Sequence, residues 1–449
     1  MLGPKRKHKR LLRFIIALIA TAVATLVLMG DIKVRVPTSI NELCETHGLL
    51  CSLQTACNRH SFRCRFGVSS DSSIQRVIGE WKPAVLYYNR HGGCRTNLFA
   101  ALEKLGLSSK MATFDPSQLS GYGMSHARAQ QLIQRGHVQF VCNKYDVVVV
   151  ADTIPHARAL LLSLLETDTR IQCQSKIVLE ITNRFDWRVK DVDAYYWMMR
   201  ALVEATESRL KGRLFWVANN AFDKAYIEAR LGVKMPFIRL IRPMGVATKS
   251  QYPWDLPKPS LSNFAAQKHY SEIYSGLSKN YSIPITVFPF GHKYGGPQHL
   301  LRFKAFIDVP YQYSTMKFYE NIAHGVPLLI PTPRFLDELF NTGIHTMLDT
   351  NILKDLHRQL QQPVNAISGF PKWSAYMDYY DPLFAPFVYY VDSFKEFQEM
   401  ADKSWKELDS RNVRQKGPEF YGAYRRLIVQ EWLQLFRDMW PAAAVFHSV

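Results

Sequence analysis

Cysteine is absent from the second half of the chain and scarce in the first. The 449 residues include seven cysteines, and none follows Cys173. A disulfide framework therefore cannot support the C-terminal region, which needs an apolar core instead. The first four cysteines are separated by seven, six and seven positions and lack the Cys-x2-Cys pair of compact zinc sites. We predict two disulfides here, with unspecified pairing and zinc as the alternative. These residues are Cys44, Cys51, Cys57 and Cys64.

Long uncharged apolar runs are also missing, with one exception near the N-terminus. Phe14–Met29 carries no charge and follows six basic residues, with no acid, in residues 1–13. With Gly30 the run is about 17 residues long, at the short end of what spans a bilayer, and its basic flank stays cytoplasmic. We predict a cytosolic tail (1–13), a transmembrane signal anchor (14–30) and a Cys-containing stem (31–82). A cleaved signal peptide is the alternative.

This topology predicts a single-pass type II protein of the Golgi or endoplasmic reticulum membrane, with its main body in the lumen. The clustered cysteines suit that oxidising compartment. Cys94, Cys142 and Cys173 are scattered through the next region, and the odd total leaves a free thiol or an intermolecular bridge. Asn280-Tyr281-Ser282 is a possible glycosylation acceptor.

Acidic residues are few compared with basic ones. The chain has 56 Lys and Arg against 38 Asp and Glu, a formal charge of +18. The six basic residues before the apolar run account for +6, which leaves 18 − 6 = +12 for residues 31–449. This surplus suits an anionic ligand or a membrane face. Nucleic acid is excluded as a partner because the basic residues are dispersed and no nucleic-acid motif is present.

Repeats and low-complexity tracts are absent, and from Pro83 onward strand-like and helix-like segments alternate. This alternation predicts an α/β fold with parallel sheets. We expect two doubly wound, Rossmann-like domains facing a cleft, at residues 83–242 and 243–420, and a last helix in 421–449 that packs back on the first domain. The predicted strands lie within 84–89, 145–152, 176–182, 213–219 and 236–247, and within 285–291, 303–310, 328–330 and 387–393.

The stretch Tyr313–Leu339 is the most informative part of the chain. Its apolar residues recur at helical spacing, Gly325 and Pro327 end the helix, and a buried strand follows. Glu320 lies near the middle of this helix. An ordinary α/β unit with a solvated Glu320 is the alternative interpretation.

The pattern S-x-x-K-x-x-E-x-x-A-x-G-x-P-x-x-x-P in this stretch resembles the nucleotide-sugar segment of the GT-B glycosyltransferases. The resemblance implies that Glu320 accepts hydrogen bonds from the ribose hydroxyls of a nucleotide-sugar donor. In retaining families another Glu stands eight positions earlier, where this chain has Gln312. The resemblance also implies catalysis that requires no metal or other cofactor.

Several residues near this segment are candidates for binding the donor's diphosphate. Glycines in Gly291-His292-Lys293-Tyr294-Gly295-Gly296 would let backbone N–H groups approach phosphate oxygens, and Lys293 would offset their charge. Ser314 and Thr315 are candidate helix N-caps or phosphate donors. Lys317 either offsets phosphate charge or pairs with Glu320 one helical turn away.

The first domain offers three candidates for the group that takes the acceptor's proton. His91 follows the first predicted strand and is preferred, because an imidazole has a near-neutral pKa. Asp152 ends the next clear strand, and His156 comes one turn later. Each could instead be structural. Asp186, Asp191 and Asp193 are too dispersed for a divalent-metal cluster, and no metal site is predicted.

We therefore predict a membrane glycosyltransferase that moves a sugar from a nucleotide-sugar donor to a glycan or protein acceptor in the secretory pathway. The alternatives are a nucleotide-sugar epimerase of the same fold and a non-catalytic lectin-like or scaffolding membrane protein, since fold alone does not determine function.

Overall fold

The computed structural model describes residues 83–107, 110–120, 123–248, 258–268, 273–289, 293–345 and 372–440. The predicted cytosolic tail, signal anchor and cysteine-containing stem occupy residues 1–82 and lie outside these ranges. Within the described ranges, no helix is both long and apolar enough to cross a membrane.

The first sheet has six parallel strands in the order β2-β1-β3-β4-β5-β6. Every strand except β2 was predicted. β2 was missed because it is a half-exposed edge strand without a continuous apolar run. The chain steps outward from β1 to β2 and then returns to the other side of β1 for β3, so the strand order reverses between β1 and β3. The strands are β1 (Val85–Tyr88), β2 (Met111–Phe114), β3 (Val147–Ala151), β4 (Lys176–Ile181), β5 (Leu214–Ala218) and β6 (Arg239–Leu240).

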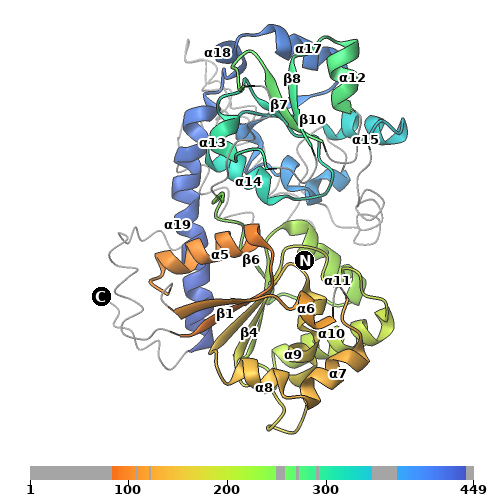
Figure 1. Cartoon of the computed structure of the whole chain (residues 1–449), viewed down its shortest axis with the longest axis vertical. Helices are drawn as coiled ribbons and strands as arrows, with labels where there is room; N and C mark the ends of the chain where they lie inside the picture. The colour runs from red at the N-terminus through yellow and green to blue at the C-terminus, as the bar shows by residue number, and fades with distance from the viewer. Residues whose placement is uncertain are drawn as a thin grey trace, which may run out of the picture. The chain divides into compact units, whose positions relative to one another are not determined.

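Helices cover both faces of this sheet (Figure 1). Successive strand residues point to opposite faces. The ring of Tyr87 lies 6.2 Å from that of Phe99 in α5, whereas Tyr88 Oη lies 3.0 Å from His137 Nε2 in α8. α5 and α8 therefore lie on opposite faces. The helices of this region are α5 (Gly92–Lys104), α6 (Ser117–Ser120), α7 (His126–Gln134), α8 (His137–Cys142), η2 (Ile154–Ala157), α9 (Arg158–Ser163), α10 (Val192–Thr206) and α11 (Ala221–Leu231).

The second sheet has five parallel strands in the order β11-β10-β9-β7-β8. β7 was not predicted, and its order relative to β8 and β9 places a second reversal between β7 and β9. The strands are β7 (Phe264–Gln267), β8 (Ile285–Phe288), β9 (Phe306–Ile307), β10 (Leu328–Pro331) and β11 (Val388–Val391). The helices are α12 (Ile273–Asn280), α13 (Pro297–Leu300), α14 (Met316–Ala323), α15 (Pro333–Asn341), η3 (Lys372–Tyr376), η4 (Asp378–Tyr380), η5 (Ala385–Phe387), α17 (Phe394–Asp402), α18 (Trp405–Leu408) and α19 (Val413–Met439).

The last helix, α19, contacts both α5 and α14 (Figure 1). It begins at Val413 and not near Tyr421 as the sequence suggested, because Pro418 sits inside the helix without ending it. The approach to α14 is close. A Cβ atom added to Gly417 would lie 2.5 Å from the carbonyl oxygen of Ile322, so no larger residue fits there without a shift.

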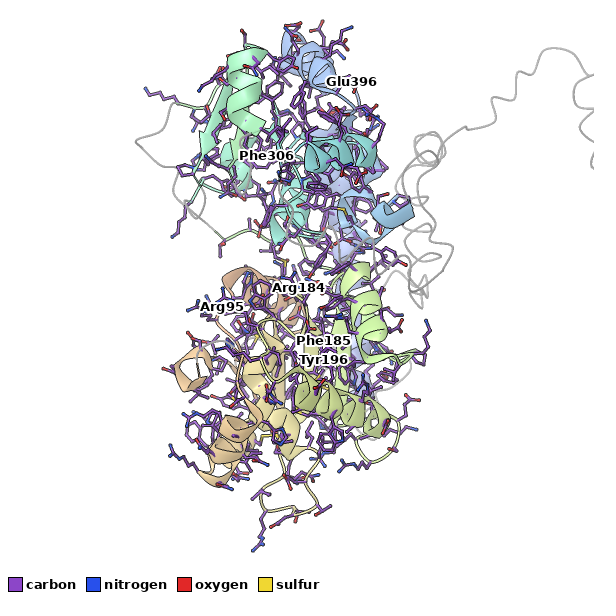
Figure 2. All side chains as sticks on the ribbon, turned by 90° about the vertical axis from the view of Figure 1, so that its right-hand side faces the viewer. Arg95, Arg184, Phe185, Tyr196, Phe306 and Glu396 are labelled. Atoms are coloured by element: carbon purple, nitrogen blue, oxygen red, sulfur yellow. A yellow bond between two sulfur atoms is a disulfide. The ribbon has the colours of Figure 1, made fainter. Side chains whose placement is uncertain are left out.

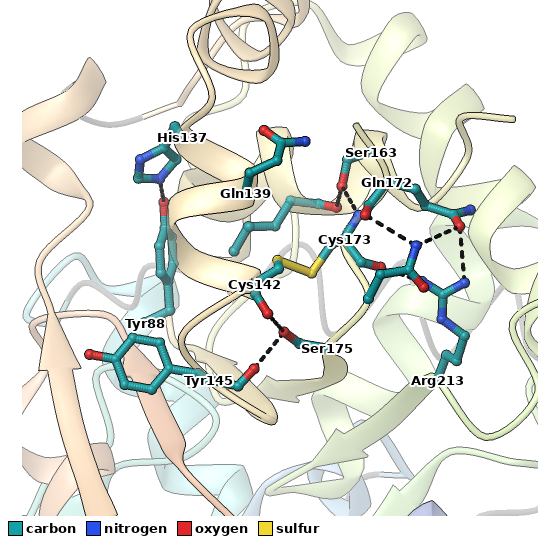
Figure 3. Close-up of a disulfide and its surroundings, with 12 residues drawn as sticks. Tyr88, His137, Gln139, Cys142, Tyr145, Ser163, Gln172, Cys173, Ser175 and Arg213 are labelled. Carbon is teal, nitrogen blue, oxygen red and sulfur yellow. Dashed lines mark hydrogen bonds between the residues drawn. A yellow bond between two sulfur atoms is a disulfide. The ribbon is translucent and has the colours of Figure 1, made fainter. Parts of the chain in front are cut away.

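Cys142 and Cys173 form a disulfide, and Cys94 remains a buried free cysteine. The four cysteines predicted to pair in the stem lie outside the described residues. The Ser175 hydroxyl is hydrogen-bonded to the carbonyl oxygens of Cys142 (3.0 Å) and Tyr145 (2.6 Å), which ties the start of β4 to the end of α8 (Figure 3).

Replacing both Cys142 and Cys173 with serine is expected to lower the free energy of unfolding by about 3 to 4 kcal/mol, because the bond closes a loop of 31 residues. Urea denaturation with and without reductant measures this effect. Reductant should destabilise the wild-type protein by a similar amount and leave the double variant unchanged. Equal stability of the oxidised wild type and the variant would contradict the expectation.

Candidate functional site

The carboxyl ends of β1, β3 and β4 form one edge of the first sheet, at the strand-order reversal where doubly wound sheets bind ligands. Asn89, which is buried, joins two of the loops at this edge. Its side-chain amide donates to the carbonyl oxygen of Ala151 (2.6 Å) and accepts from the backbone N–H of His91 (2.9 Å). The residues that follow β1 are thereby held beside those that follow β3.

His91 is exposed and is the N-cap of α5. α5 begins directly after it, at Gly92. The reason is that His91 Nδ1 accepts the backbone N–H of Cys94 (3.2 Å), which satisfies a donor of the first turn. With Nδ1 accepting, the proton of the neutral ring lies on Nε2. His91 must therefore give up this hydrogen bond before Nδ1 can accept a proton.

Asp152 directly follows β3 and adopts a left-handed backbone conformation, with φ of 58°. Its carboxylate accepts the Thr153 hydroxyl (2.9 Å) and is partly exposed. The third candidate base, His156, is only 2 % exposed in η2. Of the three, His91 and Asp152 are brought together at the sheet edge, and one His91 ring nitrogen and one Asp152 oxygen lie within 4.8 Å of each other.

Two further residues at this edge were not singled out from the sequence. Glu180 is 5 % exposed, and burial, assisted by the nearby charge of Asp152, raises its pKa to about 8. The thiol of Cys94 is 3.3 Å from Thr182 Oγ1, and burial raises its pKa as well. Glu180 could have been singled out in the sequence, because it is an acid inside the otherwise apolar strand KIVLEIT. Nothing in the spacing of Cys94 indicated that it lies near Thr182.

The loop that follows β4 is fixed by aromatic packing. Phe185 stacks on Tyr196 of α10, with ring centroids 5.6 Å apart (Figure 2). The hydroxyl of Tyr196 donates to Asp186 (2.5 Å), and the Tyr226 hydroxyl reaches the same carboxylate. Asp186, considered above as a dispersed acid, is thus occupied in holding this loop.

The second part of the site is α14. Thr315 is its N-cap and accepts the backbone N–H of Phe318 (3.3 Å), as one of the two sequence interpretations predicted. Thr315 Oγ1 also lies 3.0 Å from the hydroxyl of Tyr379. Ser314 is buried beside the Tyr319 hydroxyl (3.4 Å). Both hydroxyls are therefore engaged within the protein.

Glu320 is half-buried, and among the described residues no donor lies within hydrogen-bonding distance of its carboxylate. Burial raises its pKa to about 7, although the charge of Lys317 opposes this rise. Lys317 itself pairs with the buried carboxylate of Asp308 (3.1 Å) and lies over the ring of Phe306. The pair is not with Glu320, because the side chain of Lys317 turns toward the loop after β9.

The glycine-rich loop packs by Tyr294 on the second sheet, where its ring lies 6.4 Å from that of Phe306 in β9. Burial, and then the charge of Glu320, raises the pKa of Tyr294. Lys293 is exposed, Gly295 has φ of 86° and packs against His299, and Gly291 lies outside the described residues. Gln312 is half-buried in the loop before α14.

The two parts of the site approach each other at the starts of α5 and α14. A Cβ atom added to Gly93 would lie 3.3 Å from His91 Cε1 and equally 3.3 Å from Met316 Cγ. His91 therefore lies close to the first residue of the helix that carries Glu320.

No family model and no curated protein matches the sequence. Among solved structures the chain is similar to HepE of Anabaena, solved with UDP and glucose, with a TM-score of 0.40, 8% identity and coverage of 79% of this chain and 99% of that one. It is also similar to the glycosyltransferase SnogD from Streptomyces nogalater, with a TM-score of 0.39, 11% identity and coverage of 78% and 98%. A third, the glycotransferase of kitacinnamycin, has a TM-score of 0.38, 10% identity and coverage of 80% and 99%. The chain is thus similar to glycosyltransferase structures, and the case for its own activity rests on its own residues.

Proposed function

We propose that this protein is a glycosyltransferase that uses a nucleotide-activated sugar. The observation that carries the proposal is the half-buried carboxylate of Glu320, to which no described residue donates a hydrogen bond. A desolvated carboxylate without donors is costly in a folded protein unless a ligand supplies them. The paired hydroxyls of a ribose would do so.

The donor's diphosphate would lie near the exposed Lys293 and the first turn of α14, whose free N–H groups suit an anion. Fixed positive charge at this point stabilises the diphosphate as it leaves the sugar, without a metal. Lys317 contributes less directly because Asp308 already offsets part of its charge.

The acceptor would bind at the edge of the first sheet. There Asp152 or His91 would remove the proton of the attacking hydroxyl. Asp152 is the better placed of the two, because its carboxylate keeps acceptor capacity while His91 Nδ1 caps α5.

We further propose that the catalytic body faces the lumen of the Golgi or endoplasmic reticulum, anchored by residues 14–30, and that its acceptor is a glycan or glycoprotein. The Cys142–Cys173 disulfide supports an oxidising compartment. Protease treatment of sealed microsomes should leave residues beyond about 35 protected, given that an apolar run of about 17 residues just spans the bilayer. Digestion of the main body from outside would overturn this topology.

A screen of UDP, GDP, CMP and their sugars by thermal shift identifies the nucleotide, since ligand at 100 times its dissociation constant adds about 2.7 kcal/mol of stability. Sugar transfer or donor hydrolysis with the best donor then tests catalysis. Binding without either reaction would indicate the non-catalytic alternative.

Glu320→Gln is expected to weaken binding of that nucleotide by roughly 1.5 to 3 kcal/mol, because Gln is nearly isosteric but no longer a charged acceptor. Calorimetric titration measures the affinity. The matched control is Glu399→Gln, which alters an exposed glutamate of α17 that pairs with Lys395 (3.8 Å) and should bind normally. Full affinity in Glu320→Gln would exclude Glu320 as the ribose ligand.

The same variant should remove the pH dependence that Glu320 contributes to stability. The carboxyl has a pKa of about 7 in the folded protein against 4.5 ordinarily, so the folded state holds the extra proton between these values. This contribution therefore falls as pH rises from about 4.5 to 7 and stays low above that range. Glu320→Gln should melt higher than the wild type at pH 8, and the gain should vanish toward pH 4.5. A lower melting temperature at pH 8 would contradict this reasoning.

A further inference from the structure

The edge of the first sheet contains a set of side chains that the proposed transfer reaction does not fully use. One ring nitrogen of His91, the sulfur of Cys94 and a carboxylate oxygen of Asp152 all lie within 4.8 Å of one another. We propose that these three residues form a binding site for a soft divalent cation such as Zn²⁺, with one coordination position open.

The distances suit this ligand set. Zinc bonds to nitrogen and oxygen are about 2.1 Å and to sulfur about 2.3 Å, so tetrahedral ligand atoms lie roughly 3.5 Å apart. The three ligand atoms, now 4.8 Å or less apart, reach this separation by side-chain adjustment alone. Cys94 and His91 lie one turn apart at the start of α5, and the Asn89 hydrogen bonds hold Asp152's loop beside them.

The types of ligand atom determine which metal ion the site prefers. A thiolate and an imidazole favour Zn²⁺ over Mg²⁺ or Ca²⁺, which prefer oxygen ligands. One thiolate and one aspartate also balance the two positive charges. Three protein ligands with an open position are typical of zinc sites that bind water or a substrate.

A buried carboxylate supplies the second observation. Glu180 is 5 % exposed, and its Oε2 has no hydrogen-bond partner among the described residues. In the sheet register Glu180 pairs with Ala151, the residue before Asp152. Thr182, two residues after Glu180, has its side chain on the same face, 3.3 Å from the Cys94 sulfur. Glu180 thus faces the cluster with an unpartnered carboxylate oxygen.

Cation binding would change the hydrogen bonds of Thr182 and of His91, the N-cap of α5. Once Cys94 loses its thiol proton to solvent, the Thr182 hydroxyl can turn to donate to the sulfur, a common outer-shell contact in metal sites. Ligation by His91 Nδ1 displaces the hydrogen bond from the Cys94 N–H. Ligation by Nε2 moves the ring proton to Nδ1, with the same consequence. Metal binding therefore replaces the hydrogen bond between the Cys94 N–H and His91 Nδ1 with a bond between His91 and the metal.

This site lies on the first sheet, and its existence does not depend on the proposed transfer. Its test accordingly uses neither donor nor acceptor. The purified full chain is stripped with chelator and titrated with Zn²⁺ or Co²⁺, and bound metal is measured by equilibrium dialysis and elemental analysis. We expect one tightly bound cation per chain and, with Co²⁺, a thiolate-to-metal charge-transfer band.

The variants identify the ligands. Cys94→Ser should abolish the charge-transfer band, and His91→Asn should lower metal affinity at least about tenfold, since even outer-shell losses have that effect. His91→Asn is also safe for folding, because His91 is exposed and Asn is a good N-cap. His299→Asn, a histidine of α13 remote from the cluster, is the matched control and should bind metal normally.

Two results would overturn the proposal. One is a wild-type chain that binds no cation. The other is a chain in which Cys94→Ser and His91→Asn keep the cation and its charge-transfer band, which would assign the metal to other cysteines. Neither result bears on nucleotide binding at Glu320, so failure of this site and failure of the proposed function remain distinguishable.

Discussion

Asp152→Asn should lower the rate of sugar transfer by about 10²- to 10⁴-fold, the usual loss when a general base is removed, while nucleotide affinity stays within a few-fold. The reason is positional. Asp152 directly follows β3 at the strand-order reversal of the first sheet, whereas Glu320 is on α14 of the second. Steady-state turnover with the best donor, together with calorimetric titration of the nucleotide, separates the two effects.

The comparison must include the other two candidate bases. His91→Asn keeps a good helix cap and removes the imidazole, so a loss of turnover reflects the missing imidazole and not unfolding, while His91→Ala would add about 1 kcal/mol of destabilisation from the lost cap. His156→Ala removes a buried side chain and should act mainly on stability. If a folded Asp152→Asn protein keeps wild-type turnover and His91→Asn is inactive, the general base would be assigned to His91.

Arg242→Met should lower the free energy of unfolding by about 3 to 5 kcal/mol, the usual cost of removing one partner from a buried ion pair. Arg242 is 1 % exposed and pairs with Asp378 and with Asp381 (2.6 Å). It lies just after β6, whereas the two aspartates lie at η4, beyond the second sheet's β10. Without the guanidinium, the two carboxylates would remain buried and uncompensated.

A triple variant distinguishes lost charge balance from lost packing. Arg242→Met combined with Asp378→Asn and Asp381→Asn removes all three charges together, and most of the stability should return because no buried charge is left unpaired. Urea denaturation of the single and triple variants measures this recovery. A single variant within 1 kcal/mol of the wild type would contradict the assigned role.

Local patterns were sufficient for most of the fold. Alternation of apolar strands and amphipathic helices predicted nine of the strands, because a strand buried on both faces reads as a short apolar run. The two missed strands show the limit of that signal. β2 is a half-exposed edge, and β7 is the four-residue segment FAAQ, whose burial depends on its neighbours β8 and β9.

The site was predicted in part. Glu320 was identified through the resemblance of its segment to the GT-B nucleotide-sugar segment, whereas Thr315 was identified as a cap from residues within one helical turn. One of the two interpretations of Lys317, a pair with Glu320 by helical spacing, was wrong, because Lys317 pairs with Asp308 from the loop after β9. Helical spacing gives the possible neighbours on one helix, and it cannot reveal a competing partner from another element.

The sequence by itself therefore determined the elements, their parallel α/β arrangement, and the helix that carries Glu320, because these follow from periodicity over a few residues. Only the tertiary structure decided that His91, Cys94, Asp152 and Glu180 meet at one sheet edge. Those residues come from three segments up to 89 positions apart, 180 − 91 = 89. Their proximity depends on strand order and register, which are set by long-range packing of the whole sheet and leave no short-range pattern in the chain.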